Sequence, residues 1–265
     1  MTSARRAWCV AVAIVTGCGR VAFDPLAGRD ARAIGDGFAT DVPTPTGLVG
    51  RWKLDEGAGT VAADSSGFAD TGNFVGAPTW ASGHVGNALE FPGDGTSAFL
   101  DVPDAAQLQL PQSWSIAAWV KVVALPAAGN YDTIACKSTA GGFANYNLLV
   151  DNGHVTTGAG FMIAYNGSGT GSCGIANAKS GAPSLGTWTH VAAVYDQVAQ
   201  NLALYIDGTQ VALTDQTSCA PSHTGAGEDF TIGTEYGGGT TELSGLVDDV
   251  QSTIARSPPV RSPKR

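Results

Sequence analysis

The segment LGTWTHVAAVYDQVAQNLALYIDGTQVAL, residues 185–213, decides the fold class. Residues 188–195 are almost all β-branched, aromatic or small, and they contain no glycine or proline. In residues 202–206 the leucine and isoleucine side chains fall on every second position, so they share one face of a strand. The Asp-Gly pair at 207–208 favours a type I′ hairpin turn, because both central residues of that turn need φ > 0. The segment therefore predicts the centre of an antiparallel sheet.

The same segment resembles the signature of a known family. W-T-H-V-A-A-V-Y-D, followed after a short gap by L-Y-I-D-G, is similar to laminin-G-like domains, a branch of the concanavalin A-like lectin/glucanase superfamily. Further matching segments occur in the expected order at 48–57, 64–67, 86–91, 115–121, 230–233 and 243–250. The resemblance implies an all-β fold, a two-sheet antiparallel β-sandwich of jelly-roll type. It does not specify the function, since this fold hosts lectins, adhesion modules, hydrolases and spacers.

The composition agrees with one all-β domain over residues 47–250. The chain of 265 residues contains 36 glycines and 13 prolines with short apolar runs between them, which fits many strands joined by turns. No window combines a helical period with capping residues. In residues 113–121 both parities are partly apolar, so we expect a strand that is covered on both faces, with Trp119 in the core.

The N-terminus resembles an export signal. Arg5 and Arg6 precede an apolar run at 7–15 that is too short to span a bilayer. The V-T-G-C sequence that ends this region resembles a bacterial lipobox, in which cleavage leaves Cys18 as the first residue, carrying a lipid. Residues 1–17 would then be a lipoprotein signal peptide. The alternative is an ordinary signal peptide that happens to contain a cysteine.

Residues 18–46 predict a flexible tether. They lack a sustained apolar period and end in Pro-Thr-Pro-Thr, which favours extended backbone. Gly19, which follows the cysteine, resembles lipoproteins that are sorted to the outer membrane. The expected location is therefore extracytoplasmic, with the protein anchored to the membrane by its N-terminal lipid, at a bacterial outer membrane or cell surface.

Charge and cysteines restrict the partners further. The formal net charge of −9 argues against nucleic acid, whose binding depends on clustered Lys and Arg. In an exported protein we expect two of Cys136, Cys173 and Cys219 to pair. We assign the disulfide to Cys173 and Cys219, which lie in turn-like surroundings, because Cys136 lies in a strand-like run where a thiol packs as a small hydrophobe.

Catalytic patterns are weak in this sequence. A glycosidase needs two carboxylates held about 5–9.5 Å apart, and no strand here shows alternating acidic residues. Glu235 and Glu242 stand alone near glycines, and they are the residues that a divergent hydrolase would use. His190 lies inside the W-T-H-V-A motif, where a structural histidine is expected rather than a catalytic base. We therefore expect no enzymatic activity.

A structural calcium ion is one interpretation of the first acidic loop. Asp64 opens the sequence D-S-S-G, with Asp70 close behind, and Asp249 lies on the last strand, which jelly rolls place beside the first. The family resemblance implies that such a junction can hold Ca²⁺, which takes six to eight oxygen ligands. In the alternative, Asp64 caps a turn and Asp249 accepts a backbone amide.

Exposed aromatic side chains are the candidates for binding a ligand, because a flat ring can stack on a sugar. Tyr131, Tyr165 and Tyr236 each lie beside Gly or Asn in a turn-like sequence, although any of them could be an ordinary surface residue. The expected function is a non-catalytic carbohydrate-binding or adhesion module. The alternative is a structural or protein-interaction module whose partner is an envelope or surface protein rather than a glycan.

The C-terminal residues 251–265 depart from the family pattern. Two prolines at 258–259 cannot donate to a sheet. A shifted codon frame permits V-Y-D-R-A-L-S-A, which is similar to the family's ending, so a frameshifted terminus is one interpretation and a divergent tail is the other. We expect the closing strand to be cut short after about Val250, and the residues that follow to form an aberrant, disordered tail.

Overall fold

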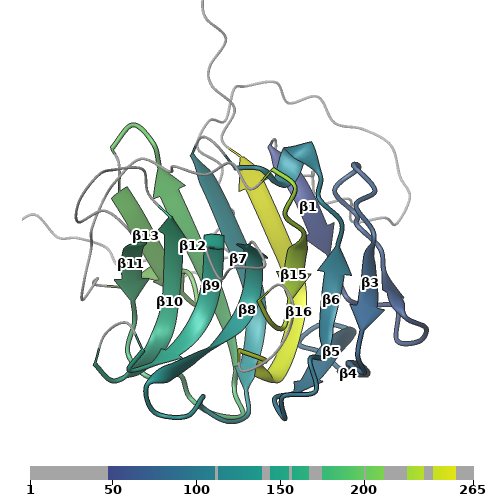
Figure 1. Cartoon of the computed structure of the whole chain (residues 1–265), viewed down its shortest axis with the longest axis horizontal. Coiled ribbons are helices and arrows are strands. Elements are labelled where there is room, and N and C mark those ends of the chain that lie inside the picture. The colour runs from purple at the N-terminus through teal and green to yellow at the C-terminus, as the bar shows by residue number, and fades with distance from the viewer. Residues whose placement is uncertain are drawn as a thin grey trace, which may run out of the picture. The chain divides into compact units, whose positions relative to one another are not determined.

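The chain folds into a β-sandwich, shown in Figure 1. The computed structural model describes residues 47–110, 113–138, 144–154, 157–166, 175–199, 201–211, 226–235 and 241–254. These residues form two eight-stranded sheets in which all strand pairs are antiparallel, so the predicted all-β sandwich is confirmed. The only helical element in the described part is η1 (Ala106–Leu108), a 3-10 turn. None of the described residues forms a helix that is long and apolar enough to cross a membrane.

The sheet that contains the segment at 185–213 is called sheet A. Its strands follow a path across the sheet, and β1 (Leu48–Trp52) pairs with β16 beside this path. In order they are β14 (Thr209–Gln210), β13 (Asn201–Ile206), β12 (Trp188–Asp196), β7 (Trp114–Val122), β16 (Ser244–Ile254), β5 (Asn87–Pro92) and β4 (Thr79–Ser82).

The second sheet, sheet B, packs against sheet A (Figure 1). Its strands, in order, are β11 (Ile175–Lys179), β10 (Ala159–Asn166), β9 (Ala144–Asn152), β8 (Asn130–Ser138), β15 (Phe230–Ile232), β6 (Phe99–Val102), β3 (Gly72–Val75) and β2 (Val61–Ala62). β8 and β9 lie near the middle of this sheet and carry most of the residues discussed below.

The predicted hairpin is confirmed. β13 and β14 pair with Ile206 opposite Thr209, which leaves a two-residue turn. Asp207 and Gly208 both have positive φ, 49° and 76°, as a type I′ turn requires. The alternation along β13 also holds, since Leu202 and the next leucine in the same parity are buried in the core.

Aromatic rings fill the space between the sheets. Trp114 lies 5.5 Å from the ring of Tyr146 and 5.9 Å from the ring of Tyr195. Tyr165 lies 5.1 Å from Tyr195 in the same cluster. All four side chains are buried, and burying large rings contributes much of the stability of a core of this kind.

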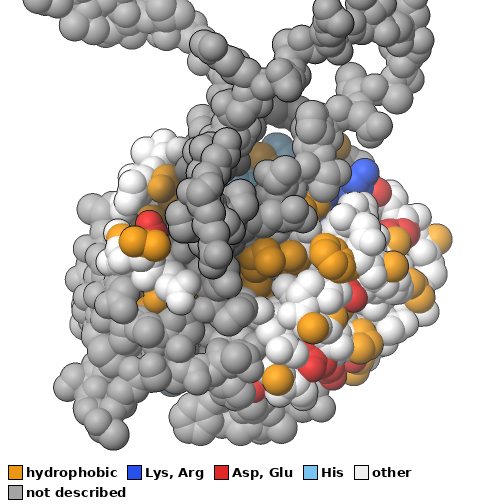
Figure 2. All heavy atoms as spheres, turned by 90° about the horizontal axis from the view of Figure 1, so that it is seen from above, with side chains coloured by type: hydrophobic (Ala, Val, Ile, Leu, Met, Phe, Trp, Pro, Cys, Tyr) orange, Lys and Arg blue, Asp and Glu red, His pale blue; other side chains and the backbone are white. Residues whose placement is uncertain are grey.

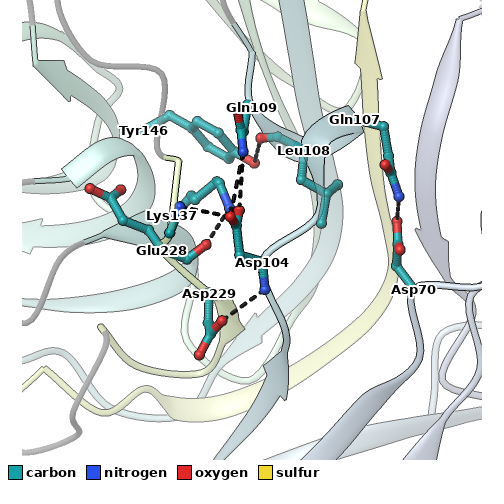
Figure 3. A network of polar contacts seen from close by, with 10 residues as sticks. Asp70, Asp104, Gln107, Leu108, Gln109, Lys137, Tyr146, Glu228 and Asp229 are labelled. Carbon is teal, nitrogen blue, oxygen red and sulfur yellow. Dashed lines mark hydrogen bonds and ion pairs between the residues drawn. The ribbon is translucent and has the colours of Figure 1, made fainter.

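A buried lysine lies on the inner side of β8, near the C-terminal end of that strand (Figure 3). Lys137 is fully buried and donates to a carboxylate oxygen of Asp104 at 2.8 Å and to the backbone oxygen of Glu228. Burial opposes the ionisation of Asp104, but hydrogen bonds from Lys137 and from the amide of Gly227 outweigh it, so the pKa of Asp104 is lowered. The charge of the lysine is therefore paired and hydrogen-bonded, as a buried ammonium group requires.

The last strand is longer than expected. β16 extends four residues past Val250 to Ile254, with β7 on one side and β1 on the other. The predicted cut-off of the strand at Val250 is therefore wrong, because residues 251–254 still find strand partners on both sides. A register shift between Asp248 and Gln251 marks a bulge, in which Asp249 has a φ of 46°. The rest of the predicted tail, residues 255–265, lies outside the described residues.

Acidic side chains are scattered over the described part of the surface in Figure 2, where little basic colour is seen. This distribution agrees with the net charge of −9. The expected signal peptide, Cys18 and the tether lie outside the described residues.

Candidate functional site

A group of polar side chains lies on the outer face of sheet B, along β8 and β9, and it is the principal candidate site. In β9 the residues Tyr146, Leu148 and Val150 point into the core, so the alternate residues point away from it. Two of these alternate residues are Asn145 and Asn147, both buried. Buried amides on the outside of a sandwich are unusual, because such positions are normally occupied by side chains that are hydrated.

Tyr131 and Glu235 meet beside these amides. The Tyr131 hydroxyl donates to Oε2 of Glu235 at 2.9 Å, and Nδ2 of Asn147 donates to Oε1 of the same carboxylate, also at 2.9 Å. Burial raises the pKa of Glu235, and burial together with the charge of Glu235 raises the pKa of Tyr131. The tyrosine therefore stays protonated and acts as a hydrogen-bond donor to the carboxylate at neutral pH.

One polar atom in each of these two amide groups lacks a hydrogen-bond partner among the described residues. Oδ1 of Asn147 and Nδ2 of Asn145 are buried and find no hydrogen-bond partner in the structure described. An unmet buried polar group costs about 1–3 kcal/mol. The free acceptor of Asn147 and the free donor of Asn145 lie on the same face of β9. They therefore suit a ligand whose groups both donate and accept hydrogen bonds.

A buried ion pair supports this face next to Tyr131. Asp151 lies opposite Tyr131 in the pairing of β8 and β9, and its carboxylate lies 2.6 Å from Nζ of Lys179. The same carboxylate accepts the backbone amides of Gly153 and His154, two and three residues further along the turn, at 3.2 and 3.1 Å. The ring of His154 packs edge-on against Tyr131 with centroids 4.9 Å apart. The ion pair thus fixes the turn that positions the histidine against the tyrosine.

The outer face of sheet A carries a second group of rings. His84 is stacked on Trp119 with ring centroids 3.6 Å apart, and His190 packs edge-on against the same tryptophan at 5.2 Å. Nζ of Lys121 lies 5.6 Å from the ring centre of Trp188. Burial lowers the pKa of His190, which favours its neutral form and agrees with a packed, structural residue.

The expectation that Trp119 belongs to the core is wrong. Residues of β7 alternate strictly between buried and half-buried, and Trp119 has the half-buried parity together with Lys121. The outer face of sheet A is therefore not covered along this strand. Apolar residues on both parities of β7 therefore did not indicate burial on both faces, since the outward-pointing Trp119 stays half-buried and stacks on His84.

A family model described as the concanavalin A-like lectin/glucanases superfamily, of laminin G type, matches residues 94–257, more than half of the chain. The chain belongs to the concanavalin A-like lectin/glucanases superfamily. No curated protein sequence matches it significantly.

Solved structures show the same fold. The chain resembles a Trypanosoma rangeli sialidase in complex with 2,3-difluoro-KDN, with a TM-score of 0.55 and 20% identity over 80% of this chain and 31% of the sialidase. It also resembles the binding domain of Paraclostridial Mosquitocidal Protein 1, with a TM-score of 0.61 and 11% identity over 80% of this chain and 50% of that one. A third is botulinum neurotoxin type C, whose cell entry depends upon interaction with two ganglioside molecules, with a TM-score of 0.55, 10% identity, and 78% and 48% coverage. The lectin-like chain thus spans between about a third and a half of these structures.

The three tyrosines expected to bind a ligand have different positions. Tyr131 lies on the polar outer face of sheet B, half-buried beside Glu235. Tyr165 is 1% exposed and packs in the core, so its assignment as a ligand-binding residue is wrong. It is the last inward-pointing residue of β10, in the same parity as Phe161 and Ile163, and the strand continues to the residue that was taken for the start of a turn. Tyr236 lies outside the described residues.

The acidic residues expected to hold calcium do not form one cluster. The Asp64 carboxylate accepts hydrogen bonds from the amides of Arg51, Ser66 and Asp70 and from the Ser66 hydroxyl. The Asp70 side chain accepts a hydrogen bond from Gln107 (Figure 3). In the part of the chain that the structure describes, no group of three or more His, Cys, Asp or Glu side chains is arranged to hold a metal ion.

The third of these residues, Asp249, forms a two-point ion pair with Arg51. The guanidinium nitrogens lie 2.7 and 3.0 Å from the two carboxylate oxygens. Hydrogen-bond donors occupy both carboxylate oxygens of Asp64 and of Asp249 and one oxygen of Asp70. The arrangement therefore does not fit a calcium ion and instead fits the turn-capping alternative for Asp64.

Of the three cysteines in the expected domain, the structure describes Cys136. Cys136 is a buried free thiol in β8, as expected for a small side chain packed in a strand. Burial raises its pKa, so the thiol stays protonated and unreactive. Cys173 and Cys219, the expected disulfide pair, lie outside the described residues.

Sequence reasoning missed the residues that complete the site, namely Asn145, Asn147, Asp151 and Lys179. A signal for the first two was present, since N-Y-N-L alternates amides with core residues at period two. Lys179 gave no comparable signal, because its partner lies 28 residues away on another strand.

Proposed function

We propose that this lectin-like domain is a non-catalytic carbohydrate-binding module that contacts sugar through the outer face of sheet B. The observation that carries the proposal is the unmet donor of Asn145 and the unmet acceptor of Asn147 beside the pair formed by Tyr131 and Glu235. A sugar hydroxyl both donates and accepts, so it can satisfy both amides. The fold also occurs in proteins whose described ligands are a sialic acid analogue and gangliosides, which supports a glycan as the ligand class.

A glycan array with the full chain tests this proposal. Asn147→Ala should weaken binding to the best polysaccharide at least tenfold, because it removes one hydrogen-bonding group from the sugar and one from Glu235. Tyr205→Ala is the matched control, since Tyr205 is half-buried on sheet A, away from the site. Loss of binding in the control alone, or no binding to any glycan, would contradict the assignment.

A non-catalytic domain should leave its bound oligosaccharides unhydrolysed. Oligosaccharides that bind should be recovered intact after prolonged incubation with the full chain. The hydrolase interpretation would use Glu235 or Glu242. Release of sugar by the full chain, abolished in Glu235→Gln or Glu242→Gln, would show that the domain is an enzyme.

The rings on the outer face of sheet A favour a second candidate function, a protein-interaction module. His84 is exposed, and Val85 beside it is 61% exposed, next to the half-buried rings of Trp119 and Trp188. Aromatic and apolar groups of this kind are enriched at protein interfaces. Trp188→Ala should remove cross-linking to an envelope or surface protein and leave glycan binding unchanged if both functions exist.

The proposed location is the cell envelope, with a lipid on Cys18 as the membrane anchor. The support for it is the sequence of residues 1–18 alone. Cys18→Ser should move the protein from the membrane fraction to the soluble fraction and remove the mass of the lipid. A variant that still sediments with membranes and carries the same added mass would refute the anchor.

A further inference from the structure

A cleft lies at the end of the sandwich where β8 begins. It has a volume of about 320 Å³ and is lined by residues of both sheets. One wall is apolar and consists of the segment 124–127, which follows β7. The lining also includes Asp132 of β8, Ser244, which is the first residue of β16, and Glu242, two residues before that strand. We call this feature the rim cleft.

Both carboxylates of the rim cleft are buried and lack a basic partner. Asp132 is 6% exposed and Glu242 is 4% exposed. Neither takes part in an ion pair with any residue that the structure describes. Burial raises the pKa of Asp132 to about 7, and the neighbouring charge of Glu242 adds to this effect. The site is therefore short of positive charge.

Among the described residues, one carboxylate oxygen in the rim cleft has no hydrogen-bond partner. Oε2 of Glu242 accepts the amide of Ser97 at 3.1 Å, but Oε1 is buried and finds no hydrogen-bond donor among the described residues. Asp132 accepts the backbone amide of Ser244, which favours its ionised form. An unpartnered carboxylate oxygen at this depth is strongly destabilising unless a donor from outside the chain approaches it.

We propose that the rim cleft binds a protonated primary amine carried on a small, partly apolar skeleton. An ammonium group has three donors and one positive charge, which suit Oε1 of Glu242, the carboxylate of Asp132 and a further oxygen such as that of Ser244. Methylene groups of the ligand would contact the apolar wall that includes Leu125 and Pro126.

A divalent metal ion fits the rim cleft less well. Calcium takes six to eight oxygens, whereas two carboxylates line this cleft and backbone amides already hydrogen-bond to both of them. The apolar wall offers nothing to a metal ion. The ammonium group could belong to an amino sugar or to a lysine side chain, since both carry the same charged group on an apolar or partly apolar skeleton.

The inference is independent of the proposed glycan-binding face, because the rim cleft lies on the other side of β8. Asp132 pairs with Val150, an inward-pointing residue, whereas Tyr131 pairs with the outward-pointing Asp151. Failure of amine binding would therefore leave polysaccharide binding through sheet B untouched, and the two proposals can be tested separately.

Calorimetric titration of the full chain with four probes tests the proposal. Glucosamine or Nα-acetyl-lysine methylamide should bind, whereas the neutral N-acetylglucosamine should bind at least tenfold more weakly at the same site. Binding of glucosamine alone identifies an amino sugar, and binding of the lysine derivative alone identifies a protein ligand; either result supports the site. Failure of both amines overturns it. Calcium chloride is the fourth probe, and calcium binding that Glu242→Gln abolishes would replace the amine site with a metal site.

Variants localise the binding. Glu242→Gln should reduce amine affinity at least tenfold, whereas Glu90→Gln, an exposed glutamate outside the cleft, should leave it unchanged. Because Glu242 is buried and its variant could misfold, Ala127→Lys provides a second test on an exposed residue of the wall. A lysine there should occupy the cleft with its own ammonium group and block the added amine. Unchanged amine binding in both variants would overturn the proposal.

Discussion

Replacing Asp151 with Asn should destabilise the domain strongly. The ion pair between Asp151 and Lys179 has a separation of 2.6 Å, and the two side chains are 0% and 3% exposed. The substitution preserves shape but leaves the lysine charge buried without its counter-charge. Removing one partner of such a pair costs about 3–5 kcal/mol. For a domain of this size each kcal/mol lowers Tm by about 2–4 °C, so we expect a fall of about 6–20 °C.

The matched control is the same substitution at a half-buried pair, which water reaches more easily. Asp249 pairs with Arg51 at 2.7 Å, but these side chains are 25% and 31% exposed. Asp249 has a φ of 46°, a conformation that Asn tolerates well, so Asp249→Asn changes the charge with little backbone strain. Ion pairs near the surface contribute about 0–1 kcal/mol, and the two-point geometry places this pair at the upper end of that range, which corresponds to a fall in Tm of about 4 °C or less.

The assay is thermal and urea denaturation of the full chain and of both variants at neutral pH. The double variant Asp151→Asn with Lys179→Met should recover most of the lost stability, because it also removes the buried lysine charge, while Asn keeps an oxygen that can accept a turn amide. Equal losses in Asp151→Asn and Asp249→Asn would refute the argument that burial sets the size of the effect. Failure of the double variant to recover stability would show that shape, rather than unpaired charge, accounts for the loss.

Two further predictions concern acidic residues. The folded state raises the pKa of Asp132 from 3.8 to about 7, so the folded protein keeps a proton that the unfolded chain has lost, and stability should fall as pH rises between these values. In urea denaturation, Asp132→Asn should lack most of this dependence of stability on pH, although Glu242, the other titratable group of the cleft, remains. The same dependence in the variant would show that another group causes it. Asp64→Ala should lower stability by about 1–3 kcal/mol, because the carboxylate accepts four hydrogen bonds in its turn. The loss should be the same with calcium or with chelator, whereas a calcium-dependent Tm that disappears in the variant would restore the metal interpretation.

The parts of the fold that were predicted correctly are those fixed by neighbours in sequence. The turn at 207–208 needs two residues that tolerate positive φ, and its Asp-Gly pair provides them. The two strands that precede this turn, β12 and β13, show the alternation that places one parity in the core. Turn chemistry and alternation act within a few residues, so they were sufficient to identify this hairpin and its antiparallel sheet. The two-sheet sandwich was predicted from the family resemblance.

The errors arise where one local signal has two structural outcomes. Tyr165 precedes an Asn-Gly pair, which favours a turn, but its parity with Ile163 places the ring inside the sandwich. Trp119 lies in an apolar run, but the outer face of sheet A is open and the ring packs under His84. Whether an aromatic residue at the end or on the outer parity of a strand is buried depends on what covers the sheet, and the covering residues are distant in sequence.

The candidate site was predicted only through Tyr131, because its other contacts join distant parts of the chain. Glu235, which accepts the hydroxyl hydrogen of that tyrosine, is 104 residues away. Asn147 reaches the same carboxylate from another strand, over 88 residues. Sequence spacing gives no information about pairs of this kind until the order of strands in the sheet is known, since β8, β9 and the segment after β15 become neighbours only in the folded sheet.

Arg51 changes the chemistry of the acidic residues that suggested a calcium site. Asp64 and Asp249 are both close to the first strand, as the calcium hypothesis required. Arg51 lies between them, and its backbone amide donates to Asp64 at 2.8 Å while its guanidinium group binds both oxygens of Asp249. The guanidinium supplies the positive charge that a metal ion would bring, and the hydrogen bond to Asp249 raises the pKa of Arg51. Two carboxylates beside one strand therefore indicate a cation, and here the chain supplies that cation itself, from a residue on the strand between them.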